Sequence, residues 1–198
     1  MSGLYTATIT SSGLRVRESR VVARLLLQHV DDRTWREEIQ EKNVLQMASL
    51  NSTKRVSLLL RARLEPLGPV VWKLVDEGDS ILATQAVFAG AIKNSRLLGD
   101  FLDLVVREQR ALFAEFLEPR LWNEYLAGCR GRDPEMPMWS DSVVEKLRSV
   151  VFSVMAEAQY LSDTRTLRFQ TVFIDPVLSE ALREQKELYV LRCLEVMQ

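Results

Sequence analysis

The 198-residue sequence is poor in the residues that build metal centres and disulfide frameworks. It contains two cysteines, Cys129 and Cys193, which are far apart in the sequence, and a single histidine, His29. A metal site rich in cysteine or histidine cannot be assembled from so few ligands, and neither can a disulfide framework. Catalysis by a nucleophile and a histidine would have to use His29. This sparse cysteine usage is typical of a reducing compartment, so we expect a cytoplasmic protein.

Long apolar runs and low-complexity tracts are also missing. With 8 glycines and 6 prolines, the composition excludes collagen-like and broadly disordered chains. The uncharged run from Ser80 to Ile92 spans thirteen residues, well short of the roughly 20 that cross a bilayer. The chain begins with polar and β-branched residues and shows no apolar core of a signal peptide. We therefore expect no contact with a membrane.

The charge is almost balanced overall but is divided unevenly along the chain. Lysine and arginine number 26 against 27 acidic residues, a net charge of −1. Residues 1–65 hold 11 basic and 7 acidic residues, a balance of +4, and residues 66–198 hold the remaining 15 and 20, a balance of −5. Such asymmetry suggests an anionic partner for the first part only.

Most of the sequence has the apolar spacing of helices, which predicts an all-α fold with at most a small β-hairpin. Helices are expected over residues 16–30, 33–42, 52–65, 70–75, 81–93, 95–116, 118–127 and 141–160, and again from residue 176. Leu4 to Thr10 and Thr166 to Ile174 alternate as strands do, so these two segments could form the hairpin. The stretch Pro66 to Pro69 predicts a linker between a basic N-terminal subdomain, residues 1–65, and a larger acidic helical domain, residues 70–198.

Motifs of enzyme chemistry are not found in the sequence. It contains no P-loop, no glycine-rich dinucleotide turn, no GxSxG elbow and no HExxH pair. Acidic neighbours such as Asp100 and Asp103 are interpreted as solvated helix faces. We accordingly predict a protein that is not an enzyme, with no catalytic residue, no cofactor, no metal ion and no small-molecule substrate.

Basic residues of the first part are arranged in a way that suits an anionic partner. Arg17, Arg20 and Arg24 follow one another at i, i+3 and i+7, which places them along one face of a helix. A later helix begins with hydroxyl and basic side chains, and the backbone N–H groups of a helix start also favour anions. Arg61 lies seven residues beyond the first cation of that helix. The residues concerned are Ser52, Thr53, Lys54, Arg55 and Arg61. Together with helix 33–42 they outline a loose helix-turn-helix. A merely solvated charged face is the alternative.

Extended segments of the same region carry a family resemblance. They are Tyr5 to Thr10, Gly13 to Arg20 and Leu45 to Arg55, continued by Leu-Leu-Arg-Ala-Arg-Leu64. The sequence resembles the BrxA family, small components of the BREX bacteriophage-exclusion systems, most strongly over residues 5–64. The resemblance implies an all-helical cytoplasmic protein with a NusB-like layout that binds double-stranded DNA without catalysis. Other BREX subunits are further candidate partners.

Three functional hypotheses follow. The first is a DNA-binding accessory protein of phage defence with low sequence specificity, whose contacts are the eight residues named above. The others are an RNA-binding factor of the NusB kind and an adaptor that holds defence subunits together. If four to six of the named side chains engage duplex DNA, log affinity should fall with log salt at a slope of roughly −4 to −5. Replacing Arg20 and Arg24 should reduce that slope by about two. Charge reversal at Lys146 and Arg148 should matter much less.

Overall fold

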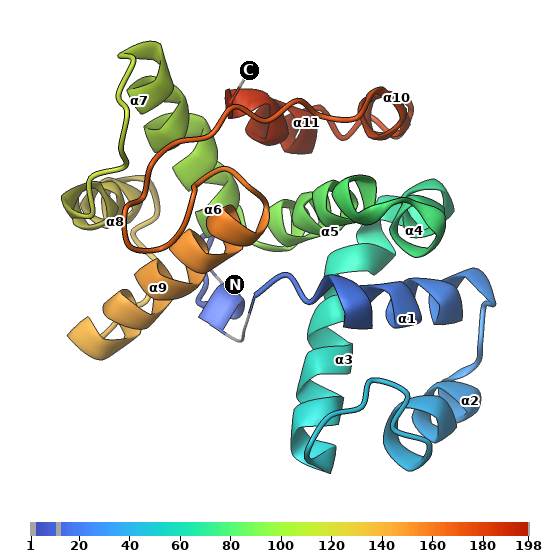
Figure 1. The fold of residues 1–198 in the computed structure, drawn as a ribbon. Coiled ribbons are helices and arrows are strands. Elements are labelled where there is room, and N and C mark those ends of the chain that lie inside the picture. The colour runs from blue at the N-terminus through green and yellow to red at the C-terminus, as the bar shows by residue number, and fades with distance from the viewer. Residues whose placement is uncertain (1–2, 11–12, 198) are drawn as a thin grey trace.

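Helices form the whole regular structure of the described residues, which are 3–10 and 13–197 of the computed structural model (Figure 1). The all-α prediction is confirmed, and no strand is present within these ranges. In chain order the α-helices are α1 (Val16–Leu27), α2 (Asp32–Arg36), α3 (Leu50–Leu64), α4 (Gly68–Glu77), α5 (Ser80–Asn94), α6 (Arg96–Asp100), α7 (Arg107–Ala111), α8 (Arg120–Arg132), α9 (Asp141–Glu157), α10 (Pro176–Glu184) and α11 (Leu188–Leu194). Glu37–Glu41 extends α2 as a π-helical turn, and Phe101–Val106 joins α6 to α7 in the same way.

Side-chain caps fix where many of these helices begin. Asp31 accepts a hydrogen bond from the Thr34 N–H at 2.7 Å and starts α2. Ser49 accepts one from the Ser52 N–H at 3.2 Å and starts α3, so this helix begins at Leu50, two residues before the predicted start at residue 52. Each cap satisfies a backbone donor that the first turn leaves free.

The stretch predicted as a linker is helical instead. Residues 65–67 form a 3₁₀ turn with Leu67 buried, and α4 begins at once with Pro69 in its first turn. Proline lacks the N–H that a first turn would leave unpaired, so it can end one helix and begin the next without a gap. The Trp72 indole N–H donates to the Leu64 carbonyl at 2.6 Å and joins α4 to the end of α3.

The proposed division into residues 1–65 and 70–198 stays a prediction. Helices from the two sides of that boundary pack together, α1 on α4 and α3 on α5. Residues 1–2, 11–12 and 198 of the two predicted parts lie outside the described residues.

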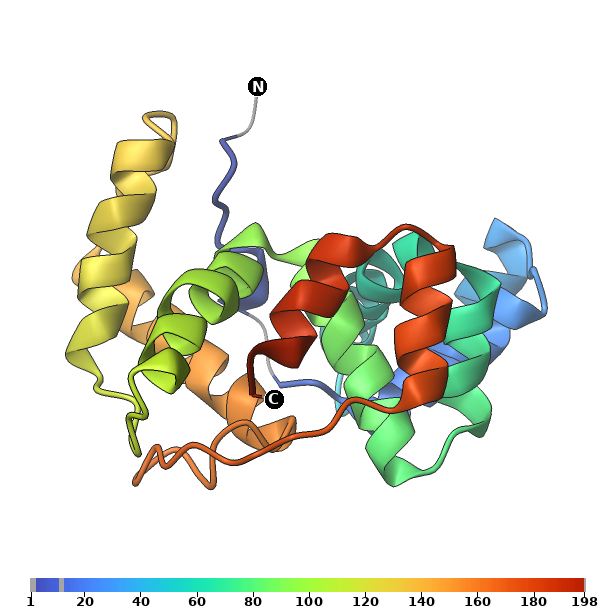
Figure 2. The same cartoon turned by 90° about the horizontal axis from the view of Figure 1, so that it is seen from above.

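Helix α5 lies at the centre of the molecule and is buried over most of its length. Helices α1, α3 and α4 pack against it, and α10 and α11 pack on its other side, as Figures 1 and 2 show. At Gly90 the backbone of α3 approaches so closely that a Cβ atom would lie 2.8 Å from the Arg63 carbonyl oxygen. Arg63 itself is buried and donates to the Gly13 carbonyl at 3.0 Å.

The helix expected over residues 95–116 ends at Ala111. Phe113 takes a left-handed conformation with φ of 57°, and its side chain is 91% exposed. The chain then turns so that Leu117 donates to the Leu167 carbonyl and Phe169 donates to the Glu115 carbonyl. The apolar spacing therefore continues beyond Ala111, but the residues that carry it do not pack as one helical face.

Residues 166–174 form no strand and do not pair with the N-terminal arm. This segment makes only isolated bridges, between Phe116 and Arg168 and between Leu161 and Phe169. The Gln85 side chain fixes its end, because its amide group donates to the Phe173 carbonyl and accepts from the Asp175 N–H, each at 2.9 Å. The predicted hairpin is therefore wrong, since α5 and residues 115–117 provide the partners instead.

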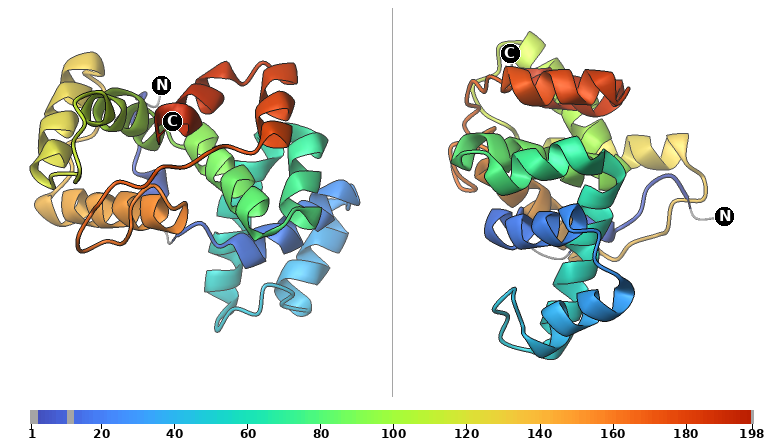
Figure 3. Two further views of the ribbon diagram at one scale, coloured as in Figure 1. Left: turned by 45° about the horizontal axis from the view of Figure 1, so that its top comes forward. Right: turned by 90° about the vertical axis from the view of Figure 1, so that its right-hand side faces the viewer.

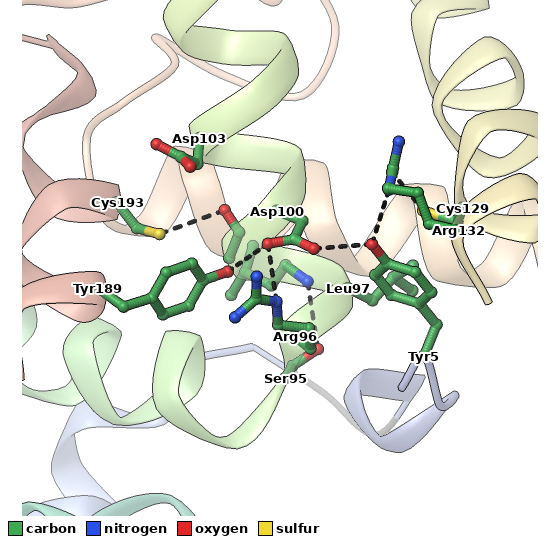
Figure 4. Close-up of polar contacts among 12 residues, drawn as sticks. Tyr5, Ser95, Arg96, Leu97, Asp100, Asp103, Cys129, Arg132, Tyr189 and Cys193 are labelled. Atoms are coloured by element: carbon green, nitrogen blue, oxygen red, sulfur yellow. Dashed lines mark hydrogen bonds and ion pairs between the residues drawn. The ribbon is translucent and has the colours of Figure 1, made fainter. Parts of the chain in front are cut away.

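A buried carboxylate, Asp100, holds the N-terminal arm against α6 (Figure 4). The Tyr5 and Tyr189 hydroxyls donate to its two oxygens at 2.7 and 2.6 Å, and Arg96 pairs with it at 2.9 Å. Asp103, one turn further along, pairs with Arg107 and Arg192. The interpretation of Asp100 and Asp103 as solvated residues is wrong, because both are buried and their charge is compensated by donors from other elements.

All four tyrosines should resist titration in the folded protein. Burial raises the pKa of Tyr5 to about 12 and raises the pKa values of Tyr125, Tyr160 and Tyr189 well above 10.0. Above pH 10 the unfolded chain loses phenolic protons that the folded chain keeps, so stability falls as pH rises from about 10 towards 12. Tyrosinate absorbance should appear only together with loss of the helical circular-dichroism signal. A tyrosinate step near pH 10 in a fully helical protein would contradict this.

No helix among the described residues has the length and apolar character to pass through a membrane.

Candidate nucleic-acid interface

The predicted arginine face of α1 is divided between two surroundings. Arg20 donates to the carbonyl oxygens of Asp76 and Gly78 at 2.6 and 2.7 Å and reaches that of Asp79 at 3.2 Å. Arg24 pairs with the Asp76 carboxylate at 2.8 Å. These cations neutralise the C-terminal end of α4, where carbonyl oxygens are unpaired and the helix dipole is negative. Both arginines therefore already have partners within the protein, and the DNA contact predicted for them stays a prediction.

Arg17 lies beside the connector that precedes α3. It is exposed and donates to the Gln46 side-chain oxygen at 2.7 Å. A single hydrogen bond to a neutral amide leaves its charge unneutralised, so Arg17 retains the character of a phosphate contact.

The hydroxyl groups at the start of α3 serve the protein's own fold. The Thr53 hydroxyl is buried and donates at 3.0 Å to the Ser49 carbonyl. It also approaches the Asn43 side-chain oxygen at 3.2 Å, and Asn43 in turn holds the connector through Met47. Ser52 is half-buried and bonded to Ser49. The hydroxyl groups predicted to bind an anion at the start of α3 are thus already hydrogen-bonded to Ser49, the residue that caps this helix.

The outward side of α3 carries the cations that remain. Asn51, Lys54, Arg55 and Leu58 are exposed at i, i+3, i+4 and i+7, and we call these four residues the α3 face. Within the described residues neither Lys54 nor Arg55 forms an ion pair. Leu58, 63% exposed, extends the same face. One helical face therefore presents an amide, two uncompensated cations and an apolar side chain to solvent.

A groove of about 410 Å³ lies between the α3 face and α2. Its lining residues are Asp32, Trp35, Arg36, Gln40, Lys54, Ser57, Leu58 and Arg61. The Arg61 guanidinium stacks on the Trp35 ring, 4.7 Å from its centroid, and pairs with Asp32 at 3.6 Å and Glu65 at 3.4 Å. Arg61 is therefore largely neutralised, whereas Arg36 is exposed in the same groove and was missed by the sequence analysis. The charged residues of the predicted helix 33–42, which include Arg36, were the sequence feature that could have indicated it.

This interface stands at one end of the molecule. Figures 1 and 3 place α2 and its connector at the end of α3 that points away from α5. The α3 face is therefore open to a partner that approaches this end of the molecule.

Residue types used in catalysis are dispersed or buried. No group of three or more histidine, cysteine or acidic side chains in the described ranges could hold a metal ion. Both cysteines are buried, and burial raises the pKa of the Cys193 thiol to about 12. His29 follows α1 and lies edge-on to Trp72, with ring centroids 6.4 Å apart. That the protein is no enzyme stays a prediction.

Fold and interface together define an all-α protein that carries a basic helix–connector–helix unit at one end. The chain matches the BrxA family model over residues 3–186 and belongs to the BrxA family. It is 46% identical over 97% of its length, and 96% of the relative's, to a "BREX protein BrxA" of Paramagnetospirillum magneticum. A protein of the same name from Escherichia coli is 34% identical over 92% of this chain and 85% of its own.

A solved structure has the same fold. It is the crystal structure of an uncharacterized protein from Magnetospirillum magneticum, with a TM-score of 0.91 and 46% identity, covering 98% of this chain and 99% of that one. The family resemblance of the sequence is thereby confirmed over nearly the whole chain.

Proposed function

We propose that this BrxA-family protein is a non-enzymatic component of a BREX system that binds double-stranded DNA. The observation that carries the proposal is the α3 face, where Lys54 and Arg55 stand exposed and unpaired beside Asn51. Phosphate contacts from such cations supply most of the affinity of a non-specific DNA-binding protein. Arg17 and Arg36 are exposed on the neighbouring elements and would add contacts to the backbone.

The shape of the interface favours duplex DNA over RNA. An exposed helix fits the major groove of B-form DNA, which is about 12 Å wide, whereas the major groove of A-form RNA is too narrow to admit one. Recognition of single-stranded RNA usually needs exposed aromatic rings on which bases stack. Trp35, the aromatic residue of this groove, is buried and covered by Arg61. These features weigh against the RNA-binding hypothesis.

A salt titration tests the proposal. Labelled duplex DNA, duplex RNA and single-stranded RNA of one sequence and length are compared by fluorescence anisotropy over a range of salt concentrations. Engagement of Arg17, Arg36, Lys54 and Arg55 would give duplex DNA a log–log slope at least as steep as about −3.6. Tighter binding of either RNA would favour the NusB-like hypothesis. Binding of neither nucleic acid would contradict the proposal and leave the adaptor hypothesis.

A further inference from the structure

A second basic groove lies in the acidic part of the chain, between α9 and the segment that follows it. Its volume is about 630 Å³, and its lining residues are Pro119, Ser142, Glu145, Lys146, Arg148, Ser149, Phe152, Thr164, Arg165 and Leu167. Three cations and a single carboxylate therefore meet in a region whose overall charge is negative. We call it the α9 groove.

Two of these cations are not neutralised by the protein. Arg148 pairs with Glu145 at 2.5 Å, which accounts for the one carboxylate. Lys146 and Arg165 are exposed, and neither is in an ion pair with any described residue. Lys146 belongs to α9 and Arg165 to the segment 161–168, and both of these elements line the groove.

The wall that carries Arg165 has a defined conformation. The Asp163 carboxylate accepts hydrogen bonds from the N–H groups of Arg165 and Thr166 at 2.7 and 2.8 Å, and from the Thr166 hydroxyl at 2.7 Å. Further along the segment, Arg168 bridges to Phe116 and Phe169 bridges to Leu161. The Asp163 carboxylate therefore fixes the turn that positions Arg165 at the groove, and it forms no ion pair with the Arg165 guanidinium.

Hydroxyl groups and the apolar floor indicate which anion the α9 groove suits. Ser142, Ser149 and Thr164 are exposed hydroxyl donors beside the cations, a combination that proteins use on phosphate oxygens. The aromatic side chain in the lining, Phe152, is buried, so no ring is offered for stacking a base. The site therefore suits a phosphodiester backbone better than a free nucleotide or an unpaired strand.

We infer that the α9 groove is a second contact surface for the phosphate backbone of duplex DNA, held chiefly by Lys146 and Arg165. This inference rests on the proposed function and extends it, since the DNA would be gripped at two separate surfaces. It also revises the expectation that Lys146 and Arg148 lie on an acidic surface of little consequence for DNA.

The test measures duplex binding of the full-length protein carrying Lys146→Ala and Arg165→Ala. Loss of two phosphate contacts should lower the magnitude of the salt slope by about 1.8 and weaken binding about 60-fold near 0.1 M salt. The matched control carries Lys73→Ala and Arg183→Ala, which removes the same charge from exposed positions on α4 and α10. The control should keep the wild-type slope. Equal slopes for the two double variants, or a slope unchanged in both, would overturn the inference.

A variant that should bind DNA more tightly provides a second test, because a damaged fold could not produce a gain of affinity. Glu145→Gln frees Arg148 from its ion pair, so duplex DNA should bind up to about eightfold more tightly near 0.1 M salt. Unchanged or weaker binding by this variant counts against the groove.

Parallel titration of the Lys54→Ala, Arg55→Ala variant separates the two proposals. If it binds more weakly while the Lys146 and Arg165 variant behaves as wild type, the inference fails and the proposed function stands. If only the Lys146 and Arg165 variant is impaired, the α9 groove stands and the α3 face is wrong. Wild-type protein that binds no duplex overturns the proposed function and, with it, this inference.

Discussion

Replacing Lys54 and Arg55 with alanine is expected to weaken duplex DNA binding about 60-fold near 0.1 M salt and to lower the magnitude of the salt slope by about 1.8. Both side chains are exposed on α3 and form no ion pair among the described residues, so their charges are available to DNA phosphates, from which they would release condensed counterions. Because phosphate contacts carry no sequence information, the ratio of affinities for different duplex sequences should change little. Anisotropy titrations at several salt concentrations measure both quantities.

The informative comparison is with Arg20→Ala and Arg24→Ala, which remove the same charge from α1. Those arginines bond to the end of α4, so their loss should leave the salt slope almost unchanged and should instead destabilise the fold by about 2 kcal/mol. Thermal unfolding followed by circular dichroism reports that change. A reduced salt slope with unchanged stability would show that the original arginine face, and not the α3 face, binds DNA.

The difference between Arg20 and Lys54 shows how far helical spacing can predict a site. Spacing places Arg17, Arg20 and Arg24 on one face of α1 correctly, because the period of an α-helix is a local property. It contains no information on what packs against that face. The end of α4, some 56 residues further along, supplies the carbonyl oxygens that bind Arg20, and only the tertiary structure brings the two together.

Helix positions follow the same rule. Where a cap residue directly precedes an apolar pattern, as at Asp31, Asp79 and Ser95, the helix begins within one residue of the predicted start. Where packing decides, prediction fails. The apolar spacing after Ala111 suggests more helix, and the alternation in residues 166–174 suggests a strand, yet each segment takes its conformation from contact with the other.

Burial of acidic residues is the property that the sequence conceals most completely. Asp100 and Glu77 both follow apolar stretches in helices, but Glu77 is exposed and Asp100 is only 4% exposed. The hydroxyl donors that compensate the buried Asp100 charge are Tyr5 of the N-terminal arm and Tyr189 of α11, which are 95 and 89 residues away. Such a partnership cannot be read from periodicity, although it determines how the two ends of the chain are fixed.

Asp100→Ala is therefore expected to be among the most damaging single substitutions, at about 3 kcal/mol. It would leave the buried Tyr5 hydroxyl, the Tyr189 hydroxyl and the Arg96 guanidinium without their shared acceptor, and removing one partner of a buried charged group costs about 3–5 kcal/mol. The lower value is appropriate because the Arg96 side chain is 43% exposed and can be partly hydrated. In a domain of this size the midpoint of thermal unfolding should fall by about 10 °C.

Tyr5→Phe and Tyr189→Phe are the matched controls for the same carboxylate. Each removes one hydroxyl donor and keeps the ring, so each should cost only about 1 kcal/mol. In the Asp100→Ala background the additional cost of Tyr189→Phe should nearly vanish, because the acceptor is already gone. Tyr5→Phe keeps a smaller cost there, because the Tyr5 hydroxyl also accepts a hydrogen bond from Arg132 at 3.0 Å. Additive losses in this double-mutant cycle, or an Asp100→Ala protein as stable as wild type, would mean that the carboxylate does not hold the arm. Hydrogen exchange at the Tyr5 amide, which donates to Asp133 at 3.0 Å, should rise in Asp100→Ala and locate the release at the arm.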